Sequence, residues 1–153
     1  MSRSATSLTG CWQLQRWAIG YSDARPPTLP YGEAATGLLL YSADGWMSAC
    51  IARAGRGRLG SDSVRHAPQT EQLAAFESYF QYAGRYTVRQ GKDGLQVVHS
   101  VTHSLNPNFV GTDQVRNMAF GDDGNLTLSA SDSLADSVTR LHSLIWSRQG
   151  ARA

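Results

Sequence analysis

Three short turn sequences divide most of the chain into pairs of extended segments. They read Asp44-Gly45, Lys92-Asp93-Gly94 and Asp122-Asp123-Gly124-Asn125, and each lies between stretches rich in β-branched and aromatic residues. Asp-Gly sequences suit the tight turns of β-hairpins because glycine adopts the positive φ angles that such turns require. The sequence therefore predicts at least three hairpins, with antiparallel strands that follow one another along the chain.

An opening and a closing segment bring the number of candidate strands to eight. An eight-stranded meander can close on itself, which leaves no strand edge exposed. A chain of 153 residues favours a single domain with one core. We therefore expect an all-β fold over residues 1–153, a closed eight-stranded antiparallel up-and-down barrel. The expected strands are 11–19, 37–41, 46–51, 85–88, 95–104, 114–120, 126–130 and 139–148.

One segment between the third and fourth expected strands departs from the β pattern. Apolar residues recur there at helical spacing behind Pro68, a residue that suits a first helical turn, and Gly84 is a suitable stop. We expect one amphipathic helix that covers an open end of the barrel. Its apolar positions are Leu73, Phe76, Phe80 and Ala83.

Composition and charge exclude several classes of protein. The net charge of +2 and the pI of about 8.7 are too weak to indicate nucleic-acid binding. The start of the chain lacks the apolar run of a signal peptide, and eighteen apolar residues never occur together, so we expect a cytoplasmic protein that does not bind membranes. Cys11 and Cys50 have no C-x-x-C spacing and are expected to be free thiols that serve as small packing residues.

Residues 55–60 read GRGRLG and match the dinucleotide-binding pattern G-x-G-x-x-G. That pattern works only when a helix begins inside it, because the free N–H groups of the helix hold the pyrophosphate. Here residues 61–67 have no helical periodicity, and the helix signal begins only at Pro68. We therefore predict a flexible loop near the barrel mouth, with Arg56 and Arg58 solvated or facing an acidic ligand.

Several segments together resemble the lipocalin-like domain family of bacteria and fungi. Gly10-Cys11-Trp12 is similar to the lipocalin G-x-W signature, and Arg148 lies where lipocalins carry an arginine over that tryptophan, a pair that closes one barrel end by cation–π stacking. The segments GLLLYSADGWMSACIAR, QYAGRYTV and HSVTHSLNPNFVGTDQVR extend the resemblance to residues 8–148.

The resemblance implies a closed eight-stranded barrel around a cavity for a small, largely apolar molecule. Some members of the family are encoded among enzymes of secondary metabolism. Typical lipocalins are secreted and disulfide-bonded, whereas this chain shows neither a signal peptide nor a cysteine framework. Extracellular transport is therefore not what we expect of it.

The segment 95–104 alternates so that Leu95, Val97, His99, Val101 and His103 share one face. An apolar face of a barrel strand points inward, which makes the two histidines candidates for polar groups in the cavity. On a strand they lie about 13 Å apart, given ~3.3 Å per residue, too far for one metal ion. We expect no metal and no cofactor. His99 is a candidate general acid or base; a packed histidine bonded to backbone or water is the structural alternative.

The segment 114–120 places Arg116, Met118 and Phe120 on one face, and the pattern leaves open which side that face takes. An inward Arg116 is a buried cation that needs an anionic partner, which a ligand carboxylate, enolate or phenolate would supply. An outward Arg116 is an ordinary solvated arginine.

Other residues are candidates for ligand contacts, although core packing explains the aromatic ones equally well. Asn108 belongs to the loop sequence LNPNFVGT, in which Phe109 and Val110 are possible lid residues. The remaining candidates are the hydroxyls of Tyr41 and Tyr86, Trp46 and Ser48 on one face of the third strand, and Phe76 on the helix.

The sequence thus supports a binder of a small, largely hydrophobic molecule, polyketide-like or another secondary metabolite. The alternative is a cofactor-independent isomerase, cyclase or dehydratase in which His99 moves a proton and Arg116 stabilises an oxyanion. Serine-hydrolase chemistry has no support, because a G-x-S-x-G motif is lacking. We expect no nucleic-acid partner, and a homodimer stays open.

Overall fold

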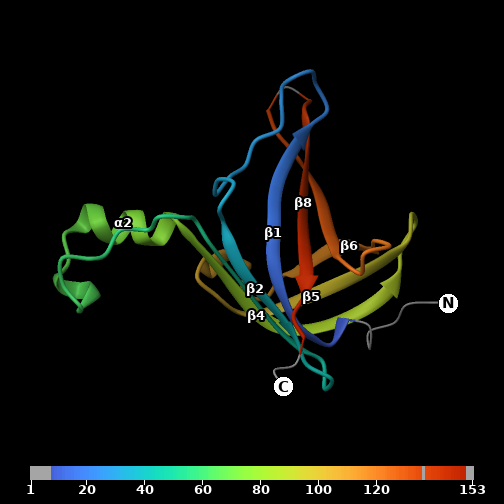
Figure 1. Ribbon diagram of the computed structural model, residues 1–153, viewed down its shortest axis with the longest axis horizontal. Coiled ribbons are helices and arrows are strands. Elements are labelled where there is room, and N and C mark those ends of the chain that lie inside the picture. Colours follow the sequence, from blue (N-terminus) through green and yellow to red (C-terminus); the bar gives the residue numbers. More distant parts are fainter. Residues whose placement is uncertain (1–7, 136, 151–153) are drawn as a thin grey trace.

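The protein forms a closed barrel of eight antiparallel strands, each paired with its neighbours in sequence and the last paired with the first (Figure 1). The computed structural model describes residues 8–135 and 137–150. The expected fold class is therefore confirmed. The strands are β1 (Gly10–Tyr21), β2 (Thr36–Tyr41), β3 (Trp46–Ala52), β4 (Tyr79–Gln90), β5 (Leu95–Ser104), β6 (Asp113–Phe120), β7 (Leu126–Ser133) and β8 (Thr139–Arg148).

One end of the barrel is closed by side chains from its first and last strands. The Arg148 guanidinium lies 4.2 Å from the ring centre of Trp12 and donates a hydrogen bond of 2.6 Å to the carbonyl oxygen of Thr9. The indole N–H of Trp12 donates to the carbonyl oxygen of Leu8 at 2.8 Å. Leu8 and Trp12 have no exposed surface. The cation–π pair expected from the sequence is confirmed, and it places the solid part of the core at this end.

A bulge in β1 changes which of its residues face inward. Leu14 pairs with Trp146 of β8 and Arg16 pairs with Ile145, so that Gln15 is an extra residue. A bulge residue shifts the alternation of a strand by one position. Trp12 and Leu14 face the interior before it, and Trp17 faces the interior after it.

A second irregularity separates Val101 from His103 in β5. Ala83 of β4 pairs with His103 and Gly84 pairs with Val101, so that Thr102 is unpaired. A Cβ atom at Gly84 would overlap the carbonyl oxygen of Ser100, which explains why glycine occupies this position. Because of the bulge, His103 is exposed, whereas Val97, His99 and Val101 are buried as predicted.

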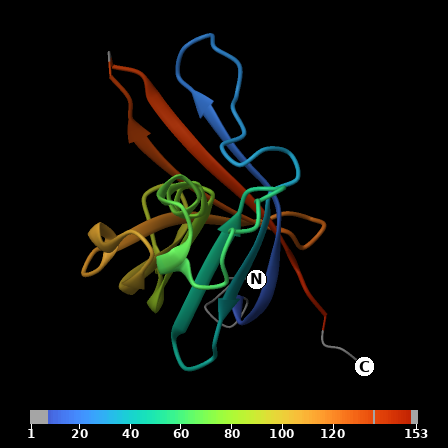
Figure 2. The same ribbon diagram turned by 90° about the vertical axis from the view of Figure 1, so that its left-hand side faces the viewer.

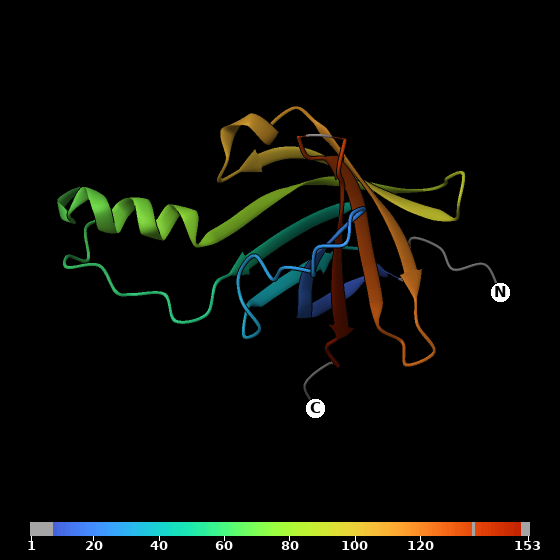
Figure 3. The ribbon, with the colours of Figure 1, turned by 90° about the horizontal axis from the view of Figure 1, so that it is seen from above.

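The helix α2 (Gln69–Glu77) lies between β3 and β4, as predicted, but it is shorter than expected and does not cover the barrel. It projects away from the strands in Figures 1 and 3, and none of its residues is buried. Leu73 is 57% exposed and Phe76 is 49% exposed. The expected continuation to Ala83 was wrong because residues 79–85 pair with all of β3, and that ladder overrides the helical spacing.

The GRGRLG loop, residues 55–60, precedes α2 in the chain and is hydrogen-bonded to it. Arg56 donates hydrogen bonds of 3.0 Å to the carbonyl oxygen of Ala75 and to the hydroxyl of Ser78, at the end of α2. The Gly60 N–H donates to a carboxylate oxygen of Glu71 at 2.7 Å. A cation at the last turn of a helix satisfies carbonyl groups that lack partners within the helix. Figure 2, in which α2 points toward the viewer, shows this loop beside the helix.

Two short 3-10 turns, η1 (Val64–His66) and η2 (Pro107–Phe109), complete the described elements. Both follow strands, and η2 lies in the connection between β5 and β6. None of the helices in the described chain has the length and apolar character needed to cross a membrane.

Candidate functional site

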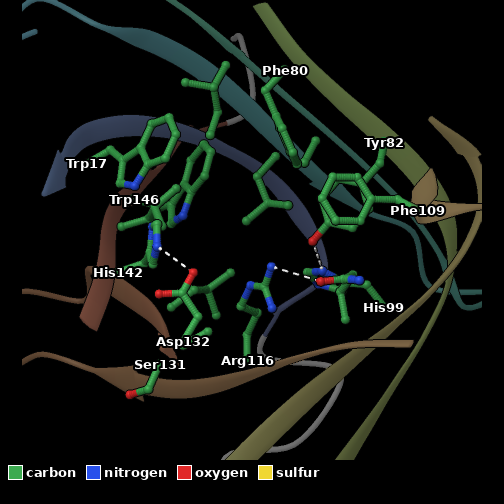
Figure 4. Close-up of a pocket in the computed structure, with 17 residues that line it drawn as sticks. Trp17, Phe80, Tyr82, His99, Phe109, Arg116, Ser131, Asp132, His142 and Trp146 are labelled. Atoms are coloured by element: carbon green, nitrogen blue, oxygen red, sulfur yellow. Dashed lines mark hydrogen bonds and ion pairs between the residues drawn. The ribbon is translucent and has the colours of Figure 1, made fainter. Parts of the chain in front are cut away.

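A cavity of about 390 Å³ occupies the barrel interior beyond the solid core. All eight strands and η2 contribute to its wall (Figure 4). Most of the lining is apolar, as expected for the inner face of a barrel whose strands alternate. The apolar lining residues are Trp17, Leu39, Ala49, Ile51, Phe80, Phe109, Leu128, Ala130, Leu144 and Trp146.

Polar lining groups gather in two places. Tyr82, His99, Gln114 and Arg116 come from β4, β5 and β6, and Ser131, Asp132 and His142 come from β7 and β8. The Asp132 side chain is 45% exposed, so the second group lies where the cavity opens to solvent. The first group lies deeper, because His99 is only 1% exposed.

His99 is held between two tyrosine hydroxyls. Its Nε2 atom lies 2.7 Å from the hydroxyl oxygen of Tyr41, and its Nδ1 atom lies 2.5 Å from the hydroxyl oxygen of Tyr82. β2, β4 and β5 supply one residue each, with all three side chains on inner faces. Both ring nitrogens of His99 are therefore engaged within the protein, and of this trio Tyr82 and His99 line the cavity.

Burial fixes the protonation states of this trio. Burial, and to a lesser extent the positive charge of Arg116, lowers the pKa of His99 to about 3. Burial raises the pKa of Tyr82 to about 12 and raises the pKa of Tyr41 well above its usual value. At neutral pH the imidazole is uncharged and both hydroxyls keep their protons.

Arg116 points into the barrel, which resolves the choice that the sequence left open. Its guanidinium donates to the carbonyl oxygen of Val115 at 2.9 Å and to the side-chain oxygen of Gln114 at 3.4 Å. Within residues 8–135 and 137–150, no carboxylate lies at ion-pair distance from it. The cavity therefore contains a cation that is hydrogen-bonded but not neutralised by a protein carboxylate.

The acidic group at the opening is already paired. Asp132 accepts hydrogen bonds from Arg140 at 2.8 and 2.6 Å, and its Oδ2 atom lies 3.4 Å from Nε2 of His142. The hydrogen bond from Arg140 lowers the pKa of Asp132. Burial lowers the pKa of His142, while Asp132 opposes that shift. Among the residues that the structure describes, this paired cluster does not neutralise Arg116, which stays available to an anion inside the cavity.

Two tryptophans of the cavity wall have enclosed indole nitrogens. In the described part of the chain, the Nε1 atoms of Trp17 and Trp146 have no hydrogen-bond acceptor. A buried donor without a partner costs about 1–3 kcal/mol. The rings of Tyr31 and Trp17 pack in a T-shaped arrangement, with 5.0 Å between ring centres. Because both indoles line the cavity, their fluorescence is suited to report a bound ligand.

Of the residues predicted from sequence, His99 and Arg116 are brought together in the cavity. Tyr41 lies behind the wall and reaches the site through His99. Tyr86 is buried, but its hydroxyl donates to the carbonyl oxygen of Ser42 at 2.7 Å and does not line the cavity.

The structure places the other predicted ligand contacts outside the cavity. Trp46 is 46% exposed and lies beneath the guanidinium of Arg85, and Ser48 shares its outer face of β3, since the inner face consists of Met47, Ala49 and Ile51. His103 is turned outward by the bulge at Thr102. Phe76 lies on the projecting helix. Asn108 is exposed in η2, although its neighbour Phe109 does line the cavity.

Sequence reasoning missed Trp17, Tyr82, Gln114, Asp132, His142 and Trp146. A signal existed in β8: the pairing of Arg148 with Trp12 sets the inward face, and counting back by two gives Trp146, Leu144 and His142. Tyr82 was not predicted to line the cavity, because the helical spacing of apolar residues predicts a helix for its segment. Trp17 was not predicted because the bulge at Gln15 shifts the alternation of β1, and no sequence signal indicates that bulge.

A metal ion in a protein needs several His, Cys, Asp or Glu side chains close together. Among the residues that the structure describes, no three His, Cys, Asp or Glu side chains gather closely enough to hold one. Cys11 and Cys50 are half-buried free thiols.

The comparison with known families agrees with the barrel fold. The family model described as a lipocalin-like domain matches residues 9–149. No curated protein matches the chain. With nearly the whole barrel matched, the chain belongs to the lipocalin-like domain family.

Proposed function

We propose that this protein binds a small, largely hydrophobic molecule inside the barrel. The observation that carries the proposal is the cavity of about 390 Å³ with a mainly apolar wall drawn from every strand. Ligand pockets in proteins typically measure about 300–1,000 Å³ and combine apolar walls with a few polar groups. The volume here suits a compact ligand of two or three fused rings.

Apolar contact supplies most of the proposed affinity. Burying ~300 Å² of ligand at about 25 cal/mol per Å² gives on the order of 7 kcal/mol before the entropic cost of association. Such a ligand binds with micromolar affinity at best unless polar contacts add to it. Arg116 offers that contact to a ligand carboxylate, enolate or phenolate, because the described residues provide it with no carboxylate partner. A polyketide-like aromatic metabolite has this combination of features.

Titration with N-phenyl-1-naphthylamine, a neutral apolar dye that brightens in apolar surroundings, tests the binding function. The dye should bind with micromolar affinity and quench the tryptophans of the cavity wall. In the Ala130→Phe variant, which fills cavity space, its affinity should fall at least about tenfold. The matched variant Ala119→Phe changes an exposed residue of β6 and should leave the affinity unaltered. Equal affinities in the two variants would contradict binding in the cavity.

An enzyme of the isomerase, cyclase or dehydratase kind is the second candidate. The hydrogen-bonded pair of His99 and Tyr82 favours it, since it lines the same cavity as a cation suited to an enolate. With both nitrogens engaged and a pKa of about 3, His99 would act through Tyr82 as a positioning residue. Mass spectrometry of compound recovered after incubation separates turnover from binding. The variant His99→Gln should then lose turnover and keep affinity for N-phenyl-1-naphthylamine, which has no acceptor oxygen for Tyr82; unchanged turnover would remove His99 from that role.

The same proposal includes a cytoplasmic location and a ligand from secondary metabolism, and it leaves open whether the protein is a homodimer. The two half-buried free thiols are consistent with a reducing compartment. Sedimentation of the purified protein measures the oligomeric state directly.

A further inference from the structure

The buried trio of Tyr41, His99 and Tyr82 has more hydrogens than its two internal hydrogen bonds use. An uncharged imidazole has one N–H group and one nitrogen with a lone pair. One tyrosine must therefore donate to the lone pair, and the other must accept from the N–H. The accepting tyrosine keeps its own O–H hydrogen, which needs a further acceptor.

The surroundings of the two tyrosines decide which one accepts. Tyr41 is 2% exposed, lies behind the cavity wall and has His99 as the hydrogen-bond partner of its hydroxyl. If Tyr41 accepted from Nε2–H, its own hydrogen would be buried without an acceptor, at a cost comparable to a lost hydrogen bond. Tyr82 lines the cavity, where water or a ligand can accept its hydrogen (Figure 4).

We propose that the trio is directional: Tyr41 donates to Nε2 of His99, Nδ1–H of His99 donates to Tyr82, and the hydroxyl of Tyr82 donates into the cavity to an acceptor oxygen of the ligand. This inference rests on the proposed binding function and names the chemistry that the ligand must carry. Tyr82 is then a ligand-binding residue, and Tyr41 and His99 are positioning residues that fix the direction of its hydrogen.

Arg116 further restricts which chemical groups the ligand can place in the cavity. Its charge lowers the pKa of Tyr41, of Tyr82 and of His99 after burial has set the larger part of each shift, so it acts on this end of the cavity. A guanidinium only donates hydrogen bonds, and the directional trio makes Tyr82 a donor as well. Two donors in the wall of the same cavity select a ketone, enolate, phenolate or carboxylate oxygen over an amine.

The tautomer of His99 tests the direction without any ligand. Two-bond ¹H–¹⁵N correlation spectra of protein labelled with ¹⁵N-histidine distinguish a protonated ring nitrogen from one with a lone pair. We expect Nδ1 of His99 to be protonated and Nε2 to be unprotonated, unchanged between pH 5 and 8. A histidine in water favours the opposite tautomer, so the result is informative. An Nε2–H signal, or a titrating His99, would overturn the proposal.

Matched probes test the ligand chemistry. The wild-type protein should bind both 2-acetylnaphthalene and 2-ethylnaphthalene, a probe of similar size that lacks the ketone oxygen. Tyr82→Phe should weaken 2-acetylnaphthalene about five- to tenfold and leave 2-ethylnaphthalene unchanged, since a typical hydrogen bond contributes about 1 kcal/mol. Tyr79→Phe, on the outer face of the same strand, is the control and should bind both probes as wild type does.

The outcomes separate this inference from the binding function. If Tyr82→Phe weakens neither naphthalene, the directional donor is wrong while binding in the cavity stands. If neither probe binds and the dye also fails, the proposed function fails, and the tautomer of His99 still decides the direction of the trio. Should Tyr82→Phe not fold, the tautomer of His99 in the spectrum of the wild-type protein decides the matter.

Discussion

At the scale of single residues, burial decides what His99 does in this protein. Alternation in β5 was enough to place it inside the barrel, and the structure confirms that position. Its partners come from β2 and β4, so that their contact with His99 depends on strand registers. The sequence therefore indicated an inward histidine, and only the assembled sheet showed that both of its nitrogens are occupied.

The buried, uncharged state of His99 predicts how stability varies with pH. The unfolded chain binds a proton at this histidine near its ordinary pKa of about 6.5, whereas the folded protein does so only near about 3. Between these values the unfolded state holds more protons, so stability is lost as pH falls. The groups that face the ring are Tyr41, Tyr82 and the charged Arg116.

Denaturant unfolding of the wild type and of His99→Gln between pH 7 and pH 4 measures this effect. The free energy of unfolding of the wild type should fall more steeply below pH 6.5, by about 1.4 kcal/mol per pH unit relative to the variant. His103→Gln, at an exposed position, should follow the wild-type curve. Parallel curves for the wild type and His99→Gln would show that the imidazole is protonated in the folded protein.

At the scale of elements, two bulges determine which side chains of β1 and β5 face the cavity. The extra residue Gln15 brings Trp17 to the cavity, and the extra residue Thr102 turns His103 outward. Period-two alternation gave the wrong side for His103 because it assumes unbroken pairing along β5. The bulge itself depends on Gly84 of the neighbouring strand, a relation that no local pattern reveals.

Replacing Gly84 with alanine should destabilise the junction of β4 and β5. The new Cβ would overlap the carbonyl oxygen of Ser100, so the strands must separate or the bulge must change. We expect a loss of about 1–3 kcal/mol in the free energy of unfolding, as for other overpacked sites. Gly20→Ala in β1, where the added atom meets nothing within 4 Å, is the control. Equal melting temperatures for the two variants would remove the steric explanation.

At the scale of the whole molecule, residues 54–77 form an arm that projects from the barrel and is a separate part of the structure. The ladder between β3 and β4 runs to Ala52 and Tyr79, and the N–H of Arg53 still donates to the carbonyl oxygen of Ser78. Residues 54–77 therefore leave and return at adjacent points of the wall. None of them lines the cavity.

Replacing residues 54–77 with Asn-Gly should leave a folded barrel with unchanged probe affinity. Asn-Gly suits a tight hairpin turn, and each halving of loop length recovers about 0.6 kcal/mol of closure entropy. We expect the melting temperature to stay equal or rise, and the affinity for N-phenyl-1-naphthylamine to match that of the full chain. A barrel that no longer unfolds cooperatively, or a dye affinity reduced tenfold, would show that the arm supports the cavity.

Local turn chemistry, alternation and a recognisable motif were enough to predict the strand order, the hairpin turns, the closed barrel and the Trp12–Arg148 closure. The extent of α2, the inward side of Arg116 and the Tyr41–His99–Tyr82 chain became visible only in the folded barrel. Those features depend on which strands pair and in what register, and one extra residue in a strand reverses every later side chain. Local sequence patterns do not predict how distant segments pair.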